Sequence, residues 1–241
     1  MTTAAGPERV VAAWDGTLFH AREGDTIEEE IARYGAFERE VQEVLFPWLR
    51  PGDNVIDAGA NIGCHACPMA IRVAPHGRVL AIEPVGRLAD RLEANCRLNG
   101  IDNVVVSRFA VSSGAGWRPL VVPHAVDNNQ GNASFHRAPS SSSDIVEVET
   151  TTIDALVAEV GFSDLRLIKT DLEGEDFAAL VGARETVKRW RPMIVFEHHR
   201  GLWAAAGQTL EGATGFLTGE LGYRVTALVR GTEVDTMLAL P

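Results

Sequence analysis

Residues 55–63 read Val-Ile-Asp-Ala-Gly-Ala-Asn-Ile-Gly, and residues 79–84 read Val-Leu-Ala-Ile-Glu-Pro. Each segment is an apolar run of strand length that ends at small or acidic residues. Gly59 and Gly63 lack a side chain, so the backbone after the first strand can lie against a ligand. Glu83 follows Gly63 by about 20 residues, the separation at which an acidic side chain meets a ribose in nucleotide-binding α/β folds. Together the two segments predict an α/β fold with a nucleoside site.

The loop between these segments lacks the G-x-G-x-x-G spacing that seats a pyrophosphate, which argues against an NAD-dependent oxidoreductase. We therefore interpret the ligand as a nucleoside without phosphates, for which S-adenosylmethionine is the leading candidate. Asp57 can meet the amino group of its methionine part, and Asn61 with the amides near Gly63 can orient the carboxylate. Glu83 can accept hydrogen bonds from both ribose hydroxyls.

Strands and helices alternate along the rest of the chain, which predicts a mostly parallel sheet covered on both faces. Helices are predicted over residues 62–73 and 177–190, and a terminal pair of strands over 223–228 and 236–240. Buried strands are predicted at 55–58, 79–82, 104–106, 165–170 and 193–196.

Two regions depart from this alternation. Residues 1–50 contain a loose strand or hairpin and two helices broken near Gly35, and we interpret them as an N-terminal extension or lid beside the ligand. Ser112 to Asp144 is rich in Gly, Asn and Ser, which is typical of turns, antiparallel ribbons and a surface loop.

Composition restricts the class of protein. The net charge is −11, with 33 acidic against 22 basic residues, so nucleic acid is not an expected substrate. No apolar run approaches the ~20 residues that cross a membrane. The three cysteines suit no disulfide framework, and we interpret Cys64 and Cys67 as packing residues of a helix. These features favour a cytoplasmic protein. The oligomeric state is open, with a homodimer as one option.

Acidic residues follow four of the predicted strands: Asp57, Glu83, Asp171 and Glu197. Ligands of open α/β sheets bind at the carboxyl ends of strands, so we expect these side chains to share one site. A hydroxyl acceptor also needs a base for its proton. The candidates are Asp171, Glu197, His198 and His199, with Asp171 and His198 ranked first. Alternatively, Asp171 with Glu173 or Glu197 could hold Mg²⁺, and the sequence does not choose between base and metal.

Four segments, taken in order, resemble the signature segments of the FkbM family of S-adenosylmethionine-dependent methyltransferases. They are Asp57-Ala-Gly-Ala-Asn-Ile-Gly63, Ala81-Ile-Glu-Pro84, Ile153-Asp-Ala-Leu156 and Ile168-Lys-Thr-Asp-Leu-Glu-Gly-Glu175. The resemblance covers roughly residues 30 to 200. It implies a Rossmann-like class I methyltransferase fold over residues 51–241, with a seven-stranded sheet whose last strand is antiparallel.

The resemblance also implies roles for individual residues. Asp57, Gly59, Asn61 and Gly63 fall at the methionine end of the cofactor and Glu83 on the ribose, with Pro84 and Ala110 beside the adenine. Asp171 faces the reacting methyl group, and Glu38 closes over the cofactor. Cys64-His65 departs from the family pattern, where aromatic or hydroxyl residues are frequent.

The function predicted from the sequence is therefore S-adenosylmethionine-dependent O-methylation of a hydroxyl on a small-molecule natural product, such as a polyketide or sugar. Two alternatives stay open. One is N- or C-methylation, and the other is a nucleoside-binding subunit of a biosynthetic assembly that has no turnover. Phe135, Trp117, Trp203 and the loop at 123–143 are candidates for the acceptor pocket.

Overall fold

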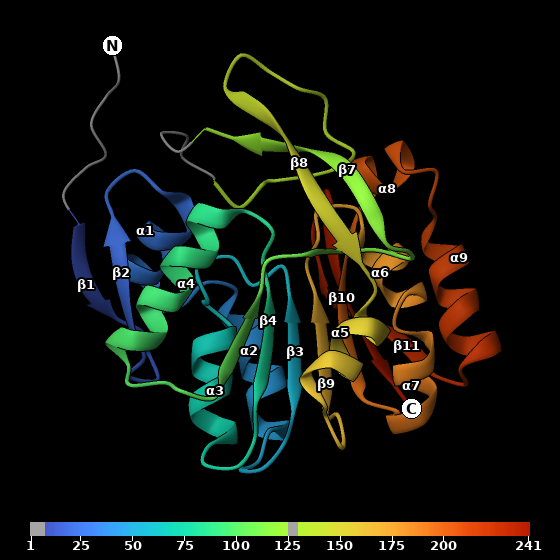
Figure 1. The fold of residues 1–241 in the computed structure, drawn as a ribbon, viewed down its shortest axis with the longest axis horizontal. Coiled ribbons are helices and arrows are strands. Elements are labelled where there is room, and N and C mark those ends of the chain that lie inside the picture. Colours follow the sequence, from blue (N-terminus) through green and yellow to red (C-terminus); the bar gives the residue numbers. More distant parts are fainter. Residues whose placement is uncertain (1–7, 125–129) are drawn as a thin grey trace.

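The computed structural model describes residues 8–124 and 130–241, and a seven-stranded sheet lies at its centre (Figure 1). Its strands are β3 (Val55–Ala58), β4 (Val79–Ile82), β5 (Val104–Ser107), β9 (Leu167–Thr170), β10 (Met193–His199), β11 (Arg224–Arg230) and β12 (Val234–Leu240). Their order is β11-β12-β10-β9-β3-β4-β5. Strands β3, β4, β5, β9 and β10 pair in parallel, whereas β12 is antiparallel to both of its neighbours. The predicted sheet, including its antiparallel last strand, is confirmed.

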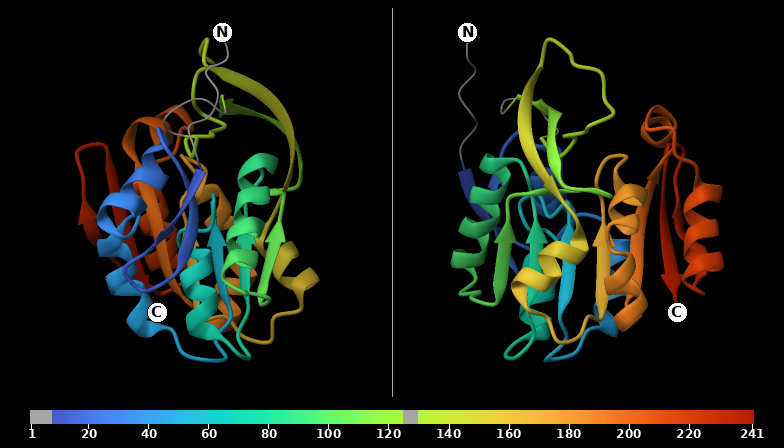
Figure 2. Two further views of the ribbon diagram at one scale, coloured as in Figure 1. Left: turned by 90° about the vertical axis from the view of Figure 1, so that its left-hand side faces the viewer. Right: turned by 45° about the vertical axis from the view of Figure 1, so that its right-hand side comes forward.

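Helices cover both faces of this sheet (Figure 2). Successive strand residues point to opposite faces, so Val55 and Val79 enter one buried cluster, and Ile56 and Leu80 enter the other. The first cluster includes residues of α1 (Thr26–Tyr34), α2 (Arg39–Leu45), α3 (Ala66–Val73) and α4 (Gly86–Leu98). The second includes residues of α5 (Ile153–Val160), α6 (Asp176–Val181), α7 (Arg184–Trp190), α8 (Arg200–Ala205) and α9 (Leu210–Gly215). Two short helical segments, η1 (Phe46–Trp48) and η2 (Phe216–Glu220), complete the helical part.

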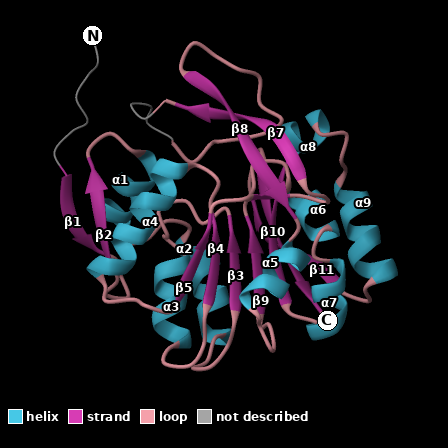
Figure 3. Ribbon diagram, viewed as in Figure 1, coloured by secondary structure: helices cyan, strands magenta, loops and turns pink. Residues whose placement is uncertain are grey.

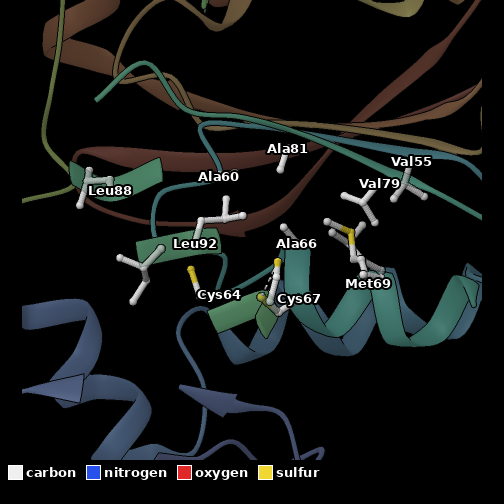
Figure 4. Packing of buried hydrophobic residues seen from close by; sticks show 14 of the residues in the cluster. Val55, Ala60, Cys64, Ala66, Cys67, Met69, Val79, Ala81, Leu88 and Leu92 are labelled. Atoms are coloured by element: carbon white, nitrogen blue, oxygen red, sulfur yellow. Dashed lines mark hydrogen bonds between the residues drawn. The ribbon is translucent and has the colours of Figure 1, made fainter. Parts of the chain in front are cut away.

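The helix predicted from residue 62 begins only at Ala66. Asn61 and Gly63 have φ angles of 49° and 90°, which lie in the left-handed region and are incompatible with an α-helix. Residues 59–65 therefore form a turn that carries the chain from β3 over the edge of the sheet. The cysteines of this region pack as expected. Figure 4 shows Cys64 and Cys67 among the aliphatic side chains between α3 and the sheet.

The single helix predicted over 177–190 is wrong, because α6 and α7 are separate helices. Gly182 lies between them, and a Cβ atom at this position would be 2.2 Å from the carbonyl oxygen of Ser112. Because Ser112 lies about 70 positions away in the sequence, the break at Gly182 cannot be predicted from the local helical pattern.

The N-terminal extension begins with a hairpin of β1 (Glu8–Ala12) and β2 (Leu18–Arg22). The Leu18 and His20 amides donate to the Asn99 and Asn95 side-chain oxygens at the end of α4. The Asp25 side chain accepts hydrogen bonds from the first amides of α1, as expected for a helix start. The extension thus packs against the main fold as part of its first buried cluster.

The region between β5 and α5 forms a second sheet that contains β6 (Ala110–Val111), β7 (Gly116–Pro123) and β8 (Ser143–Thr151). β7 and β8 pair antiparallel along their whole length, which confirms the predicted ribbon. We call residues 116–124 and 130–151 the arm. Figure 3 shows it beyond the edge at which the central parallel strands end. Residues 125–129, part of the loop considered for the acceptor pocket, lie outside the described residues.

Within residues 8–124 and 130–241, no helix combines the length and the apolar character that crossing a lipid bilayer requires.

Candidate active site

A cavity of about 230 Å³ lies where β3, β4, β9 and β10 end. Segments distant in the chain meet there: the extension contributes Phe37, and the arm contributes Leu120 and Phe135. Of the residues singled out from the sequence, the cavity is lined by Glu38, Gly59, Asn61, Glu83, Pro84, Ala110, Asp171 and Glu197. Asp57, Gly63 and His198 do not line it.

The turn after β3 is packed tightly against the end of β9. Gly59 has a φ of 83°, and a Cβ atom there would lie 1.8 Å from the carbonyl oxygen of Asp171. No other residue fits this position without moving one of the two chain segments. The Gly59 and Ala60 amides both donate to the carbonyl of Ile82, and the Asp171 amide donates to that of Ala58. These bonds fix the ends of three neighbouring strands around the cavity.

Glu83 is 5% exposed, and its carboxyl group is held from the protein side. One oxygen accepts the Val85 amide at 2.8 Å, and the other accepts the Asn61 amide at 3.0 Å. A carboxylate has about four acceptor positions, so each oxygen keeps one for a ligand. Burial raises the pKa of Glu83 to about 7, against the effect of the two amides. A ligand that donates hydrogen bonds would favour the ionised form.

Asn61 shapes the same end of the cavity through its backbone and its side chain. Its side-chain oxygen accepts the Ile62 amide at 2.8 Å, which stabilises the left-handed conformation. Gly63 lies behind this turn, where a Cβ atom would meet Cys67 Sγ at 3.0 Å and Leu92 Cγ at 3.2 Å. Gly63 therefore permits helix packing, and it does not reach the cavity.

Lys169 is a residue to which the sequence analysis assigned no role. It is buried at the centre of the parallel strands, with its Nζ 3.3 Å from Asp171 Oδ2 and 4.0 Å from Asp57 Oδ1. Burial alone would lower the pKa of Lys169, but the surrounding carboxylates, Asp171 first, raise it well above its usual value. Burial raises the pKa of Asp57 to about 6. Asp57 therefore faces an internal lysine, in a position different from the expected contact with the cofactor.

Glu38 and Glu197 lie next to this pair, with one carboxyl oxygen each of Glu38, Asp171 and Glu197 within 4.8 Å of one another. The two carboxyl groups share a hydrogen bond, so one of them carries a proton. Burial raises the pKa of Glu38 to about 7, and burial with the nearby charges of Asp171 and Glu38 raises that of Glu197 well above its usual value. We call Glu38, Asp57, Lys169, Asp171 and Glu197 the carboxylate–lysine cluster.

A Mg²⁺ site was one alternative for these acidic residues, and Glu38, Asp171 and Glu197 do place oxygens within 4.8 Å of one another. The Lys169 ammonium, however, already supplies a positive charge beside Asp171. The donor set therefore fits an internal lysine better than a divalent ion.

His198 was ranked with Asp171 as the candidate base, but its ring lies on the side of β10 away from the cavity. It packs edge-on against Trp203 at 4.9 Å between ring centroids, and its Nδ1 is 3.7 Å from Asp235 Oδ2. Its neighbour Glu197 lines the cavity, as alternation along a strand requires. Trp203 is fully buried behind it and Trp117 is exposed, so of the three aromatic candidates only Phe135 lines the cavity.

Glu175 connects the arm to the cavity. Its carboxylate accepts hydrogen bonds from Ser112 Oγ and Arg118 at 2.5 Å each and from His136 Nε2 at 2.7 Å. These bonds, with that of His136 first, outweigh burial and lower the pKa of Glu175. The Arg118 guanidinium also lies 4.0 Å from the ring centroid of Phe135. Glu175 thus ties the arm to the cavity wall, together with Glu173, whose carbonyl oxygen accepts a hydrogen bond from Ser134 Oγ at 2.7 Å.

The mixed seven-stranded sheet, with its cavity at the carboxyl ends of the parallel strands, defines a class of protein: the Rossmann-like class I methyltransferases. Within this class, the chain belongs to the FkbM methyltransferase family, because the Methyltransferase FkbM domain matches residues 57–225. The resemblance that the signature segments indicated is therefore confirmed.

The chain is also similar to known methyltransferases. The protein-L-isoaspartate O-methyltransferase of Ignicoccus hospitalis is 32% identical over 123 residues, which are 51% of this chain and 56% of that protein. The hexuronic acid methyltransferase AglP of Haloferax volcanii is 28% identical over 166 residues, which are 68% of this chain and 64% of that protein. The chain thus spans about half the length of the first of these relatives.

A solved structure shows the same fold. The methyltransferase FkbM of Methylobacillus flagellatus superimposes with a TM-score of 0.55 at 17% identity, over 83% of this chain and 50% of that one. At this identity the similarity concerns the fold alone.

Proposed function

We propose that this protein is an S-adenosylmethionine-dependent methyltransferase that methylates a hydroxyl group of a small-molecule natural product, such as a polyketide or sugar. The observation that carries this proposal is the carboxyl group of Glu83. It is buried at the end of β4, held by two backbone amides, and open to a cavity with one acceptor position on each oxygen. A pair of neighbouring ribose hydroxyls matches that arrangement.

The residues of the cavity suit the cofactor of this family. Pro84 and Ala110 provide an apolar surface for a base next to the ribose position. Gly59 lets the chain approach closely, and Asn61 presents its side chain to the same space. When bound, S-adenosylmethionine supplies an electrophilic methyl group, so the protein has to position the acceptor and accept its proton.

Asp171 is our candidate for the base. Its side chain lines the cavity and is 22% exposed, and Lys169 contacts only one edge of its carboxylate. A carboxylate oxygen that faces the cavity can accept a hydrogen bond from an acceptor hydroxyl and then its proton. Glu197 is the second candidate, but it has to lose the proton that it shares with Glu38.

The acceptor end of the cavity supports a hydroxyl compound. Phe37 and Phe135 offer aromatic surface, and Glu173 adds a carboxyl group whose pKa burial raises to about 7. Aromatic faces and carboxyl groups together suit polyols. A relative that acts on hexuronic acid supports a sugar acceptor as well. The acidic lining and the net charge of −11 argue against nucleic acid. N- or C-methylation and nucleoside binding without turnover remain the alternatives.

Calorimetry with S-adenosylhomocysteine tests the cofactor, and transfer of labelled methyl groups to a panel of hydroxylated metabolites tests turnover. Asp171→Asn serves as the variant without a base, and Glu43→Gln, an exposed change on α2, is its control. We expect binding in all three proteins and methyl transfer in the wild type and the control. Binding without transfer to any acceptor would favour a nucleoside-binding subunit, and no binding at millimolar ligand would reject the proposal.

A further inference from the structure

The carboxylate–lysine cluster carries more negative than positive charge. One ammonium faces four carboxyl groups, and two of these share a proton. The single ammonium therefore does not neutralise the cluster. No other cation balances its charge among the described residues that face Lys169. The His65 ring is neutral, because burial holds its pKa well below the usual value, and burial raises the pKa of the Cys64 thiol.

Two polar atoms of the cavity lining also lack a hydrogen-bond partner in the described part of the chain. They are Glu38 Oε2 and His65 Nε2, which lie 3.6 Å apart, too far for a direct hydrogen bond. His65 is 2% exposed and lines the cavity. Unpartnered buried polar groups are costly, so their presence points to a ligand that completes this end of the cavity.

The charges of two neighbouring carboxyl groups outside the cluster are balanced by arginine side chains. Glu173 is 3.2 Å from the Arg137 guanidinium, and Glu175 pairs with Arg118. The excess negative charge is therefore concentrated at the carboxylate–lysine cluster. Gly59 lies between this cluster and Glu83, where we place the ribose. A ligand anchored at Glu83 and extending past Gly59 would bring its next group to the cluster.

We propose that the carboxylate–lysine cluster holds the positively charged sulfonium end of the cofactor. The protein then binds S-adenosylmethionine more tightly than S-adenosylhomocysteine, and Glu38 and Glu197 set this preference. The inference rests on the proposed function. During transfer the bond between the methyl carbon and sulfur breaks, and its electron pair stays on sulfur. A bond from the methyl carbon to the acceptor oxygen forms, and the acceptor proton passes to Asp171. The sulfur loses its positive charge, and the cluster then favours release of the product.

The preference should depend on pH. As the pH rises through about 7, Glu38 ionises and the negative charge of the cluster grows. Attraction of a cation grows with it, whereas the neutral sulfur of the product gains nothing. Ionisation of Glu83 affects both ligands alike, because both carry the same ribose. It therefore cancels in the ratio of their dissociation constants.

The test is calorimetric titration of both ligands at about pH 6 and about pH 8. In the wild type we expect S-adenosylmethionine to bind roughly tenfold more tightly at the higher pH, and only a few-fold more tightly at the lower one. In Glu197→Gln the preference should shrink to within about threefold at both values. Glu43→Gln removes an equal charge at the surface and should behave as the wild type.

The wild-type measurement needs no variant, so a misfolded Glu197→Gln protein does not obscure the result. Equal or tighter binding of S-adenosylhomocysteine at about pH 8 overturns this inference but leaves the proposed function standing. Binding of neither ligand overturns the proposed function itself. Saturable binding of Mg²⁺ alone that is lost in Glu197→Gln would show that the cluster is a metal site, and would also overturn the inference.

Discussion

Replacing Glu83 with alanine removes the carboxylate that we assign to the ribose. Two hydrogen bonds to the ribose would be lost, and bonds to a charged group contribute about 1.5–3 kcal/mol each. Part of this gain is spent on ionising a carboxyl group whose pKa lies near 7 in the free protein. That ionisation takes only about 0.4 kcal/mol at neutral pH. The two bonds share one carboxylate and do not add fully, and water replaces part of them in the variant, so we expect a net loss of ~1.5–3 kcal/mol, which corresponds to roughly 10- to 150-fold weaker binding.

The change also has a structural cost, because the amides of Asn61 and Val85 lose their acceptor. Water can enter the cavity and replace part of these bonds, so the melting temperature should fall by only a few degrees. Glu83→Gln is the matched variant, since it keeps the shape and one acceptor oxygen and removes the charge. It should lose less affinity than the alanine variant.

Calorimetry with S-adenosylhomocysteine measures these effects, and thermal unfolding confirms that the variants are folded. Affinity in the wild type should also rise as the pH passes through about 7, because the bound carboxyl group must be ionised. A folded Glu83→Ala protein with unchanged affinity would refute the assignment of this residue to the ribose.

Three further outcomes are expected. Gly59→Ala should lower the free energy of unfolding by at least about 2–3 kcal/mol, as measured by denaturant unfolding. Gly207→Ala is the control, because φ is 68° there but no atom lies within 4 Å, and it should cost only about 1–2 kcal/mol. Glu175→Ala should loosen the arm and speed proteolysis within it, and exposed Glu147→Ala should not; equal cleavage rates would contradict the bridging role. Without ligand, the melting temperature should fall as the pH rises from about 4.5 to about 7, because the folded state holds protons that the unfolded chain releases. The groups that act oppositely are Asp15 and Glu175, whose pKa is lowered, and neutral His65 and His198. They are outnumbered by the carboxyl groups with raised pKa, namely Asp25, Glu28, Glu30, Glu38, Asp57, Glu83, Glu173, Asp176 and Glu197.

The parts of the site that the sequence predicts are those with a local cause. Gly59 and Glu83 are visible in the sequence because a tight turn and a strand end need particular residues next to apolar runs. The parallel direction of the central strands follows from the alternation of strands and helices, whereas their order in the sheet does not, and the antiparallel last strand was implied only by the family resemblance. The extension was expected beside the ligand, but the contacts that hold it there come from residues far along the chain and have no local signal.

The rest of the site could not be predicted, because it depends on the directions in which side chains point. Glu197 and His198 are neighbours on one strand and therefore face opposite sides, and the sequence does not tell which of them faces the cavity. Lys169 lies inside an apolar strand, where its role is apparent only once Asp57 and Asp171 are placed around it. Phe135 reaches the cavity from the arm, whose path the local pattern does not fix.

The most direct measurement is a crystal structure of the protein with S-adenosylhomocysteine. The expected result is a nucleoside at the carboxyl ends of β3 and β4, with both ribose hydroxyls donating to Glu83 and the sulfur next to the carboxylate–lysine cluster. A nucleoside bound elsewhere, or a Glu83 side chain turned to solvent in the complex, would contradict the assignment of this cavity as the active site.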